Sequence, residues 1–172
     1  MSKNWFQPLG EEIRSVPLKI LVWGSGKHDK VHYKKRKKIK RGLKKAFPKS
    51  QVFFSEDPEL DEMLEQEIGV SAQALNLARK EVLHLRYSDI AIALDTSLGV
   101  ASEIALIVGS SYGHKLYILT DEQFEGKKSF AASVRENANQ EFYTRKEFEE
   151  CSLVQRAVER CRDIALVKLI GF

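Results

Sequence analysis

One carboxylate, Glu103, interrupts an otherwise apolar stretch of the sequence. It is the only charged side chain between Asp95 and His114, and residues 100–112 (VASEIALIVGSSY) have the apolar character of a helix packed against a sheet. A buried carboxylate is costly unless it is paired or hydrogen-bonded, although the positive end of a helix dipole helps to hold an anion. Glu103 is therefore the first candidate for a working group, and the alternative is an edge position facing solvent or a second subunit.

The residues before Glu103 are those of a strand-to-helix loop that can also bind a ligand. Thr96 or Ser97 is a natural N-cap for the following helix, and Gly99 permits close approach of the backbone. Asp95 either binds a sugar or simply ends its strand with a polar residue. The loop thus combines capping residues with candidate ligand-binding residues.

A second candidate loop follows the apolar run 18–23 (LKILVW). Gly24, Ser25 and Gly26 either make a tight turn or offer backbone N–H groups to an anion. The sequence GSGKHDK lacks the third glycine of a dinucleotide-binding fingerprint. On its own it predicts a turn at the end of a strand and does not identify a ligand.

Strands and helices alternate along the chain, which predicts a parallel sheet with right-handed crossovers. An acidic, loop-like segment with a possible helical turn follows the second strand, and Ser71 is a candidate cap for the next helix. The expected strands are 18–23, 51–54, 89–94, 115–119 and 141–143, and the expected helices are 31–47, 72–87, 100–112 and 146–169.

We therefore expect an α/β, flavodoxin-like (Rossmann-like) three-layer fold with a mainly parallel five-stranded sheet of order 2-1-3-4-5. Ligands of such sheets bind beyond the carboxyl ends of the strands, where the strand order reverses. This predicts that loops 24–29 and 95–99 face each other across that edge.

The bulk properties fit one globular domain. The 172 residues are 43% hydrophobic and 30% charged, enough for one core, and we expect a single domain over 18–172 preceded by an N-terminal extension, 1–17. The two cysteines have neither metal nor disulfide spacing, the four histidines are scattered, and no signal peptide or membrane span is apparent. We expect a cytoplasmic protein that requires neither a metal ion nor another cofactor.

The charge is segregated along the chain. The net charge is +4, yet lysine and arginine fill the polar positions of the expected helix 31–47. The apolar residues Ile39, Leu43 and Phe47 of this helix recur every four residues and so share one face. One interpretation is that this basic face is simply solvated. The other is that it attracts a phosphorylated ligand or nucleic acid, with Lys27 and His28 contributing. The basic positions are Lys34, Lys35, Arg36, Lys37, Lys38, Lys40 and Arg41.

The segment SDIAIALDTSLGVASEIALIVGSSYGHKLYIL resembles the nucleoside 2-deoxyribosyltransferase-like proteins. A strand ending in aspartate, a glycine loop, a helix with a glutamate and then glycine, lysine and hydrophobic residues follow in the family's order. The motifs KILVWGSG, VFFSEDPEL and EGKKSF extend the resemblance over roughly residues 18–130. They are similar to the transferase-like domains of bacterial defence systems such as retron effectors.

The resemblance implies N-glycosidic chemistry on a nucleoside, nucleotide or NAD-like substrate. Glu103 matches the family glutamate that attacks the anomeric carbon of the sugar and forms a glycosyl-enzyme. Glu81 falls near a second family carboxylate, with a solvated helix position as the alternative. Glu56 and Asp57 resemble the element that lines the same site, with ordinary loop acids as the alternative.

Two parts of the sequence depart from the family pattern. Ser97 stands where the transferases carry an acid, and Trp23 and Gly24 replace a tyrosine near the end of the first strand. Hydrolysis, or binding without turnover in a nucleotide sensor, therefore competes with base exchange. A nucleic-acid-binding module that uses helix 31–47 is a third hypothesis. A homo-oligomer through the terminal helix stays open, and no membrane partner is expected.

Overall fold

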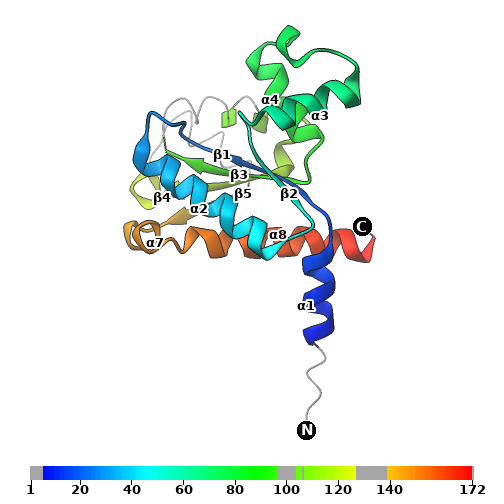
Figure 1. Ribbon diagram of the computed structural model, residues 1–172. Coiled ribbons are helices and arrows are strands. Elements are labelled where there is room, and N and C mark those ends of the chain that lie inside the picture. Colours follow the sequence, from blue (N-terminus) through cyan, green and yellow to red (C-terminus); the bar gives the residue numbers. More distant parts are fainter. Residues whose placement is uncertain (1–5, 97–103, 106, 127–138, 172) are drawn as a thin grey trace.

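A five-stranded, all-parallel sheet of order β2-β1-β3-β4-β5 forms the centre of the protein, which confirms the predicted flavodoxin-like architecture. The computed structural model describes residues 6–96, 104, 105, 107–126 and 139–171 (Figure 1). The strands are β1 (Lys19–Trp23), β2 (Gln51–Phe54), β3 (Ile90–Asp95), β4 (Leu116–Asp121) and β5 (Asn139–Tyr143).

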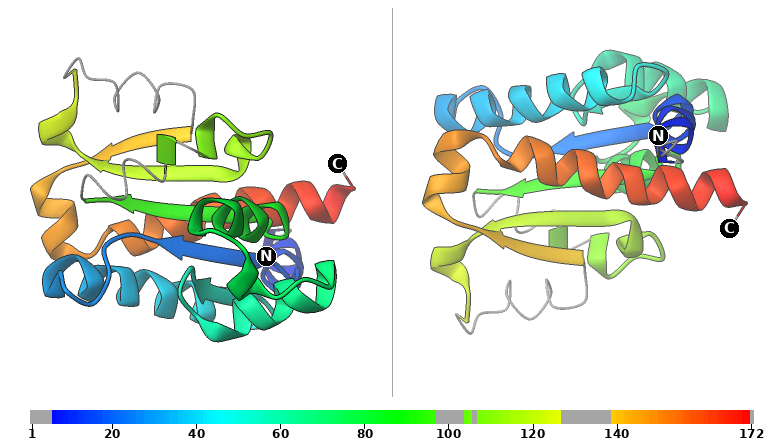
Figure 2. Two further views of the ribbon diagram at one scale, coloured as in Figure 1. Left: turned by 90° about the horizontal axis from the view of Figure 1, so that it is seen from above. Right: turned by 90° about the horizontal axis from the view of Figure 1, so that it is seen from below.

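Helices cover both faces of the sheet. On one face lie α2 (Lys30–Ala46) and α8 (Leu153–Ile170), and on the same side α1 (Phe6–Ser15) projects away from the sheet (Figures 1 and 2). Apolar side chains of α2 and α8 pack on alternate residues of the strands. On the other face lie α3 (Pro58–Ile68), α4 (Leu77–Arg86) and the helical residues around Ile104 and Ile107. None of these described helices is long and apolar enough to cross a membrane.

Burial on both faces explains why the central strands read as continuous apolar runs. Every residue of β3 is buried, and four of the five residues of β1 are buried as well. Since all strands are parallel, their carboxyl ends lie along one edge, and the register places Trp23 beside Ala93. The turns that follow β1 and β3 therefore start next to each other at that edge.

The segment between β2 and β3 differs from the expectation. The acidic stretch, expected to be loop-like with a possible helical turn, forms the whole of α3, which begins at Pro58 and is capped after Ile68 by Gly69 in the left-handed conformation. Ser71 caps only a short 3₁₀ turn, and the helix expected from residue 72 begins after Asn76, whose side chain accepts from the Arg79 N–H. Both residue types are good caps, so sequence alone favoured the earlier one wrongly.

The expected terminal helix 146–169 is two helices. The first, α7 (Arg145–Glu150), starts with a capping box at Thr144 and ends at Cys151, which adopts the left-handed conformation with φ 65°.

The helix expected over 100–112 is described at residues 104, 105, 107 and 108, and the chain turns from Gly109 onward. In the segment expected as an N-terminal extension, α1 packs on α8, with Ile13 against the core.

Gly42 lets α2 and α8 approach closely. A Cβ added at Gly42 would overlap with Cγ1 of Val154 on the first turn of α8. Valine branches at Cβ and is stiff, so it has little freedom to move away. Gly42 is therefore explained by packing, although glycine inside a helix costs roughly 0.5–1 kcal/mol relative to alanine.

We predict that Gly42→Ala destabilises the protein by about 1–3 kcal/mol through overpacking. The same change made together with Val154→Ala is expected to be neutral or stabilising by up to about 1 kcal/mol relative to Val154→Ala alone, because only the helix propensity term then remains. Urea unfolding of the four proteins in this cycle measures both effects. An equal effect of Gly42→Ala in the two backgrounds would contradict the packing explanation.

Candidate functional site

The two loops predicted to face each other are joined by a hydrogen bond. Ser25, two residues beyond the end of β1, places its Oγ 2.6 Å from the Oγ1 of Thr96, which follows β3. Ser25 is only 4% exposed. The carboxyl ends of β1 and β3 are thus held together by side chains at the point where the strand order reverses, which is where ligands of such sheets bind.

Asp95 is a buried carboxylate at the same edge. It ends β3 with 4% exposure, and the Oγ1 of Thr120, its neighbour on β4, donates to its Oδ2 at 3.5 Å. Gln140 on β5 donates in turn to Thr120 Oγ1 at 2.9 Å. A polar chain thus runs from β5 through β4 to β3, and it orients the Asp95 carboxylate in an otherwise apolar layer.

Gly24 is required by the close approach of the two strands. Its φ of +146° is a conformation that side chains rarely adopt, and an added Cβ would lie 3.2 Å from the Leu94 carbonyl oxygen. At Gly26 an added Cβ would make only ordinary contact, 3.4 Å from the ring of His28. The two predicted roles of these glycines, turn and anion binding, are compatible with this backbone.

Asp29 connects the first loop to α2. It caps the helix by accepting from the N–H of His32 at 3.1 Å, and its other oxygen lies 2.5 Å from His32 Nδ1. Partial burial acts to raise the pKa of Asp29, but the hydrogen bonds from His32 and Ser25 outweigh burial and hold this pKa below its usual value. Asp29 is therefore a carboxylate that fixes the Ser25 loop to the start of α2.

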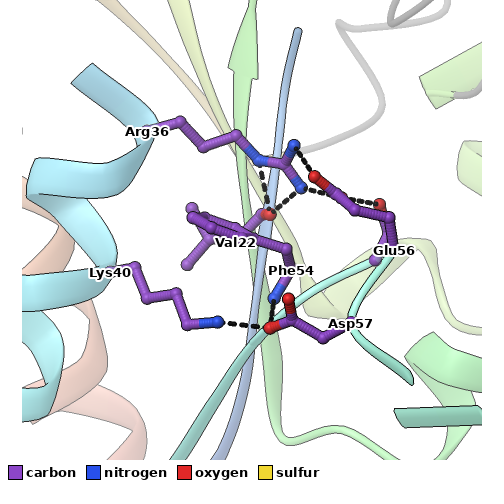
Figure 3. A network of polar contacts seen from close by, with 7 residues as sticks. Val22, Arg36, Lys40, Phe54, Glu56 and Asp57 are labelled. Carbon is purple, nitrogen blue, oxygen red and sulfur yellow. Dashed lines mark hydrogen bonds and ion pairs between the residues drawn. The ribbon is translucent and has the colours of Figure 1, made fainter. Parts of the chain in front are cut away.

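Arg36 is the most deeply buried polar side chain at this end of α2, with 1% exposure (Figure 3). Its Nε and Nη2 donate to the Val22 carbonyl at 2.9 and 2.8 Å. Its Nη1 and Nη2 donate to the two carboxylate oxygens of Glu56 at 2.9 and 2.6 Å. The expectation of a solvated basic residue is wrong for Arg36, which lies seven residues before Leu43 and so shares its inward-facing stripe.

Glu56 and Asp57 are both engaged with cations of α2. Asp57 accepts from the N–H of Phe54 at 2.8 Å and forms an ion pair with Lys40, as Figure 3 shows. The Glu56 side chain is 45% exposed, so Arg36 holds one side of it while the other meets solvent. These contacts anchor the segment after β2, and the predicted contact of Glu56 and Asp57 with a substrate stays a prediction.

Glu81 is buried on α4, with 6% exposure, which differs from a solvated helix position. Its neighbours on that helix face α3, where Lys80 and His84 both contact Asp61. The catalytic role predicted for Glu81 is untested by these contacts. Ser97, Gly99 and Glu103 lie outside the described residues.

The described contacts join Ser25 to Thr96, the residue after Asp95, and they link Thr120 to Asp95 and Asp29 to Ser25. Sequence reasoning missed Thr120 and Asp29; the available signals were a polar residue directly after the apolar run 116–119 and an Asp three residues before His32. A carboxylate and hydroxyl groups at a strand edge can accept from and donate to the hydroxyls of a sugar. Within the described ranges, no three His, Cys, Asp or Glu side chains converge on a metal position.

The solved structures that match this chain include two enzymes of low sequence identity. A CMP N-glycosidase of Clostridium botulinum, BcmB, matches with a TM-score of 0.47 and 13% identity, over 80% of this chain and 95% of that one. An azoreductase of Bacillus anthracis matches with a TM-score of 0.43 and 13% identity, over 87% of this chain and 98% of the azoreductase. No family model and no curated protein matches the sequence. At 13% identity, neither structure identifies a family for this chain.

We predict unequal losses of stability from the two ends of the Arg36–Glu56 pair. Arg36→Met leaves the buried Val22 carbonyl without its donors and is expected to cost about 2–4 kcal/mol. Glu56→Gln is expected to cost about 1 kcal/mol or less, because the carboxylate is half exposed and Arg36 keeps Val22. Urea unfolding of both variants tests the claim, and equal losses would show that the ion pair, not the carbonyl, determines the cost.

Proposed function

We propose that this protein cleaves or transfers the N-glycosidic bond of a nucleoside, nucleotide or NAD-like substrate at the carboxyl edge of β1 and β3. The observation that carries the proposal is the contact of Ser25 with Thr96 beside the buried Asp95. That contact supplies a carboxylate and hydroxyls where a ribose can be held. The resemblance of residues 18–130 to the nucleoside 2-deoxyribosyltransferase-like proteins supports this choice of substrate.

In the proposed reaction, Glu103 is the nucleophile. Its carboxylate attacks the anomeric carbon of the sugar as the bond from that carbon to the base nitrogen breaks, and the base leaves with the bonding electrons and takes up a proton. Water then attacks the same carbon, releases Glu103 and gives the free sugar; a second base in place of water gives transfer. Ser97, where the transferases carry an acid, favours hydrolysis.

The other proposed roles follow from position. Asp95 accepts from the sugar hydroxyls, and the loop of Gly24, Ser25 and Gly26 meets the sugar or a phosphate attached to it. Gly99 permits the backbone to approach this group. Glu81, a buried carboxylate on α4, is proposed to assist departure of the base.

The test is release of free base from a panel of nucleosides, their 5′-monophosphates and NAD, followed by chromatography. We expect release by the wild-type protein and a loss of about a thousandfold or more in Glu103→Gln, because the nucleophile is removed. Glu159→Gln, an exposed change on α8, is the matched control and is expected to retain full activity.

Two outcomes would reject the catalytic proposal. One is no release of base from any member of the panel, and the other is equal release by wild type and Glu103→Gln. Thermal stabilisation by a nucleotide without any release would instead identify a nucleotide sensor that uses the same edge.

A further inference from the structure

Positive charge is concentrated in one helix. Ten of the 28 lysines and arginines lie in the 17 residues of α2, which has no acidic residue, so the rest of the chain carries 18 cationic against 24 anionic side chains, a net charge of −6. A protein with this distribution has one strongly basic element on an acidic body. The basic element is therefore a local feature that the total charge of +4 conceals.

Some of these cations stabilise the fold. Arg36 and Lys40 bind Glu56 and Asp57, and Lys35 donates to the backbone carbonyl of Glu149 at 3.0 Å. Lys38 lies 3.1 Å from Cys151 Sγ. Lys44 lines a groove of about 500 Å³ with acidic residues of α3, Glu59 and Glu62 among them. These positions have a structural use or an acidic neighbour.

Five other cations form a stripe on the outer side of α2. They follow at intervals of three or four residues and are all exposed, and no acidic side chain in the described part of the chain is in ion-pair contact with them. At 100° per residue they fall within an arc of about 80°, opposite the buried Ile39 and Leu43, and they extend about 22 Å along the helix. This basic stripe consists of Lys30, Lys34, Lys37, Arg41 and Lys45.

We propose that the basic stripe binds the phosphate backbone of a nucleic-acid duplex. A regular row of exposed cations without acidic partners matches a regular row of phosphates, and this interaction needs no base contacts. The row is held straight because α2 packs on the sheet and on α8 through its opposite face (Figure 2). The backbone that carries the charges is thus fixed in advance, so binding requires the ordering of side chains but not of the helix.

The side chains around the stripe favour a duplex over other polyanions. A membrane-surface helix needs an apolar face to insert, but the apolar face of α2 is buried, and Val31 is its one exposed large hydrophobic residue among those described. Single strands are held by stacking on exposed aromatic rings. Tyr33, the aromatic residue next to the stripe, is half-buried against Phe54 and lies under Lys37.

The test is fluorescence anisotropy with labelled 20-base-pair DNA and RNA duplexes over a range of salt concentrations. We expect binding at low salt, with a slope of log affinity against log salt between about −3 and −5. In the triple variant Lys34→Gln, Lys37→Gln, Arg41→Gln, the slope is expected to shrink by about 2 to 3 and the affinity to fall at least about tenfold. Binding of either duplex supports the proposal, and comparison of the two shows which is preferred.

The matched control is Arg79→Gln, Arg86→Gln, Arg162→Gln, which removes the same charge from exposed positions outside α2. It is expected to bind like the wild type, and both variants are expected to keep the wild-type melting temperature, since all six residues are exposed. Equal losses in the two triple variants would overturn the proposal in favour of bulk charge. Failure of the wild type to bind either duplex, or tighter binding of a single strand or of anionic vesicles, would also overturn it.

Discussion

The carbonyl of Val22 imposes a constraint on which the candidate site depends. Val22 is the penultimate residue of β1 and lies opposite Phe54, the last residue of β2. A buried carbonyl without a donor costs about 1–3 kcal/mol. Arg36 donates to this carbonyl through Nε and Nη2 and to Glu56 through Nη1 and Nη2, so one side chain joins α2, β1 and the segment after β2.

The contacts of Arg36 also help to fix the loop between β1 and α2, which lies at the proposed site. Between Val22 and Arg36 the chain passes through Gly24, Ser25 and Asp29, and each has a contact that fixes its place. Gly24 allows the approach to Leu94, Ser25 reaches Thr96, and Asp29 caps α2. The loop after β1 is thus held against the end of β3, where Asp95 accepts from Thr120 of β4, which is itself bound by Gln140 of β5. A preorganised edge of this kind is what recognition of a sugar requires.

The sequence predicted the fold better than the site. Strands buried on both faces appear in the sequence as continuous apolar runs, and α2, buried on one face, appears as apolar residues such as Ile39 and Leu43 four positions apart. Residues 71–76 offer two good caps, and packing, which sequence does not display, selects Asn76. Cys151 ends α7 in a left-handed conformation, which the sequence does not predict because glycine and asparagine usually occupy such positions. Arg36 was taken for a surface residue because its charge masked its inward-facing position. Thr120 on β4 donates to Asp95, and Gln140 on β5 donates to Thr120, and only the folded sheet brings these residues near one another.

We propose that the carboxyl edge between β1 and β3 binds the sugar of a nucleoside. The test is a crystal structure of the protein soaked with cytidine, adenosine and uridine 5′-monophosphates, and separately with ribose 5-phosphate. The predicted result is electron density for a sugar in contact with Asp95 and with the loop of Gly24 and Ser25, within hydrogen-bond distance of their polar atoms. Density for the same ligands only at another surface, with this edge holding solvent, would contradict it.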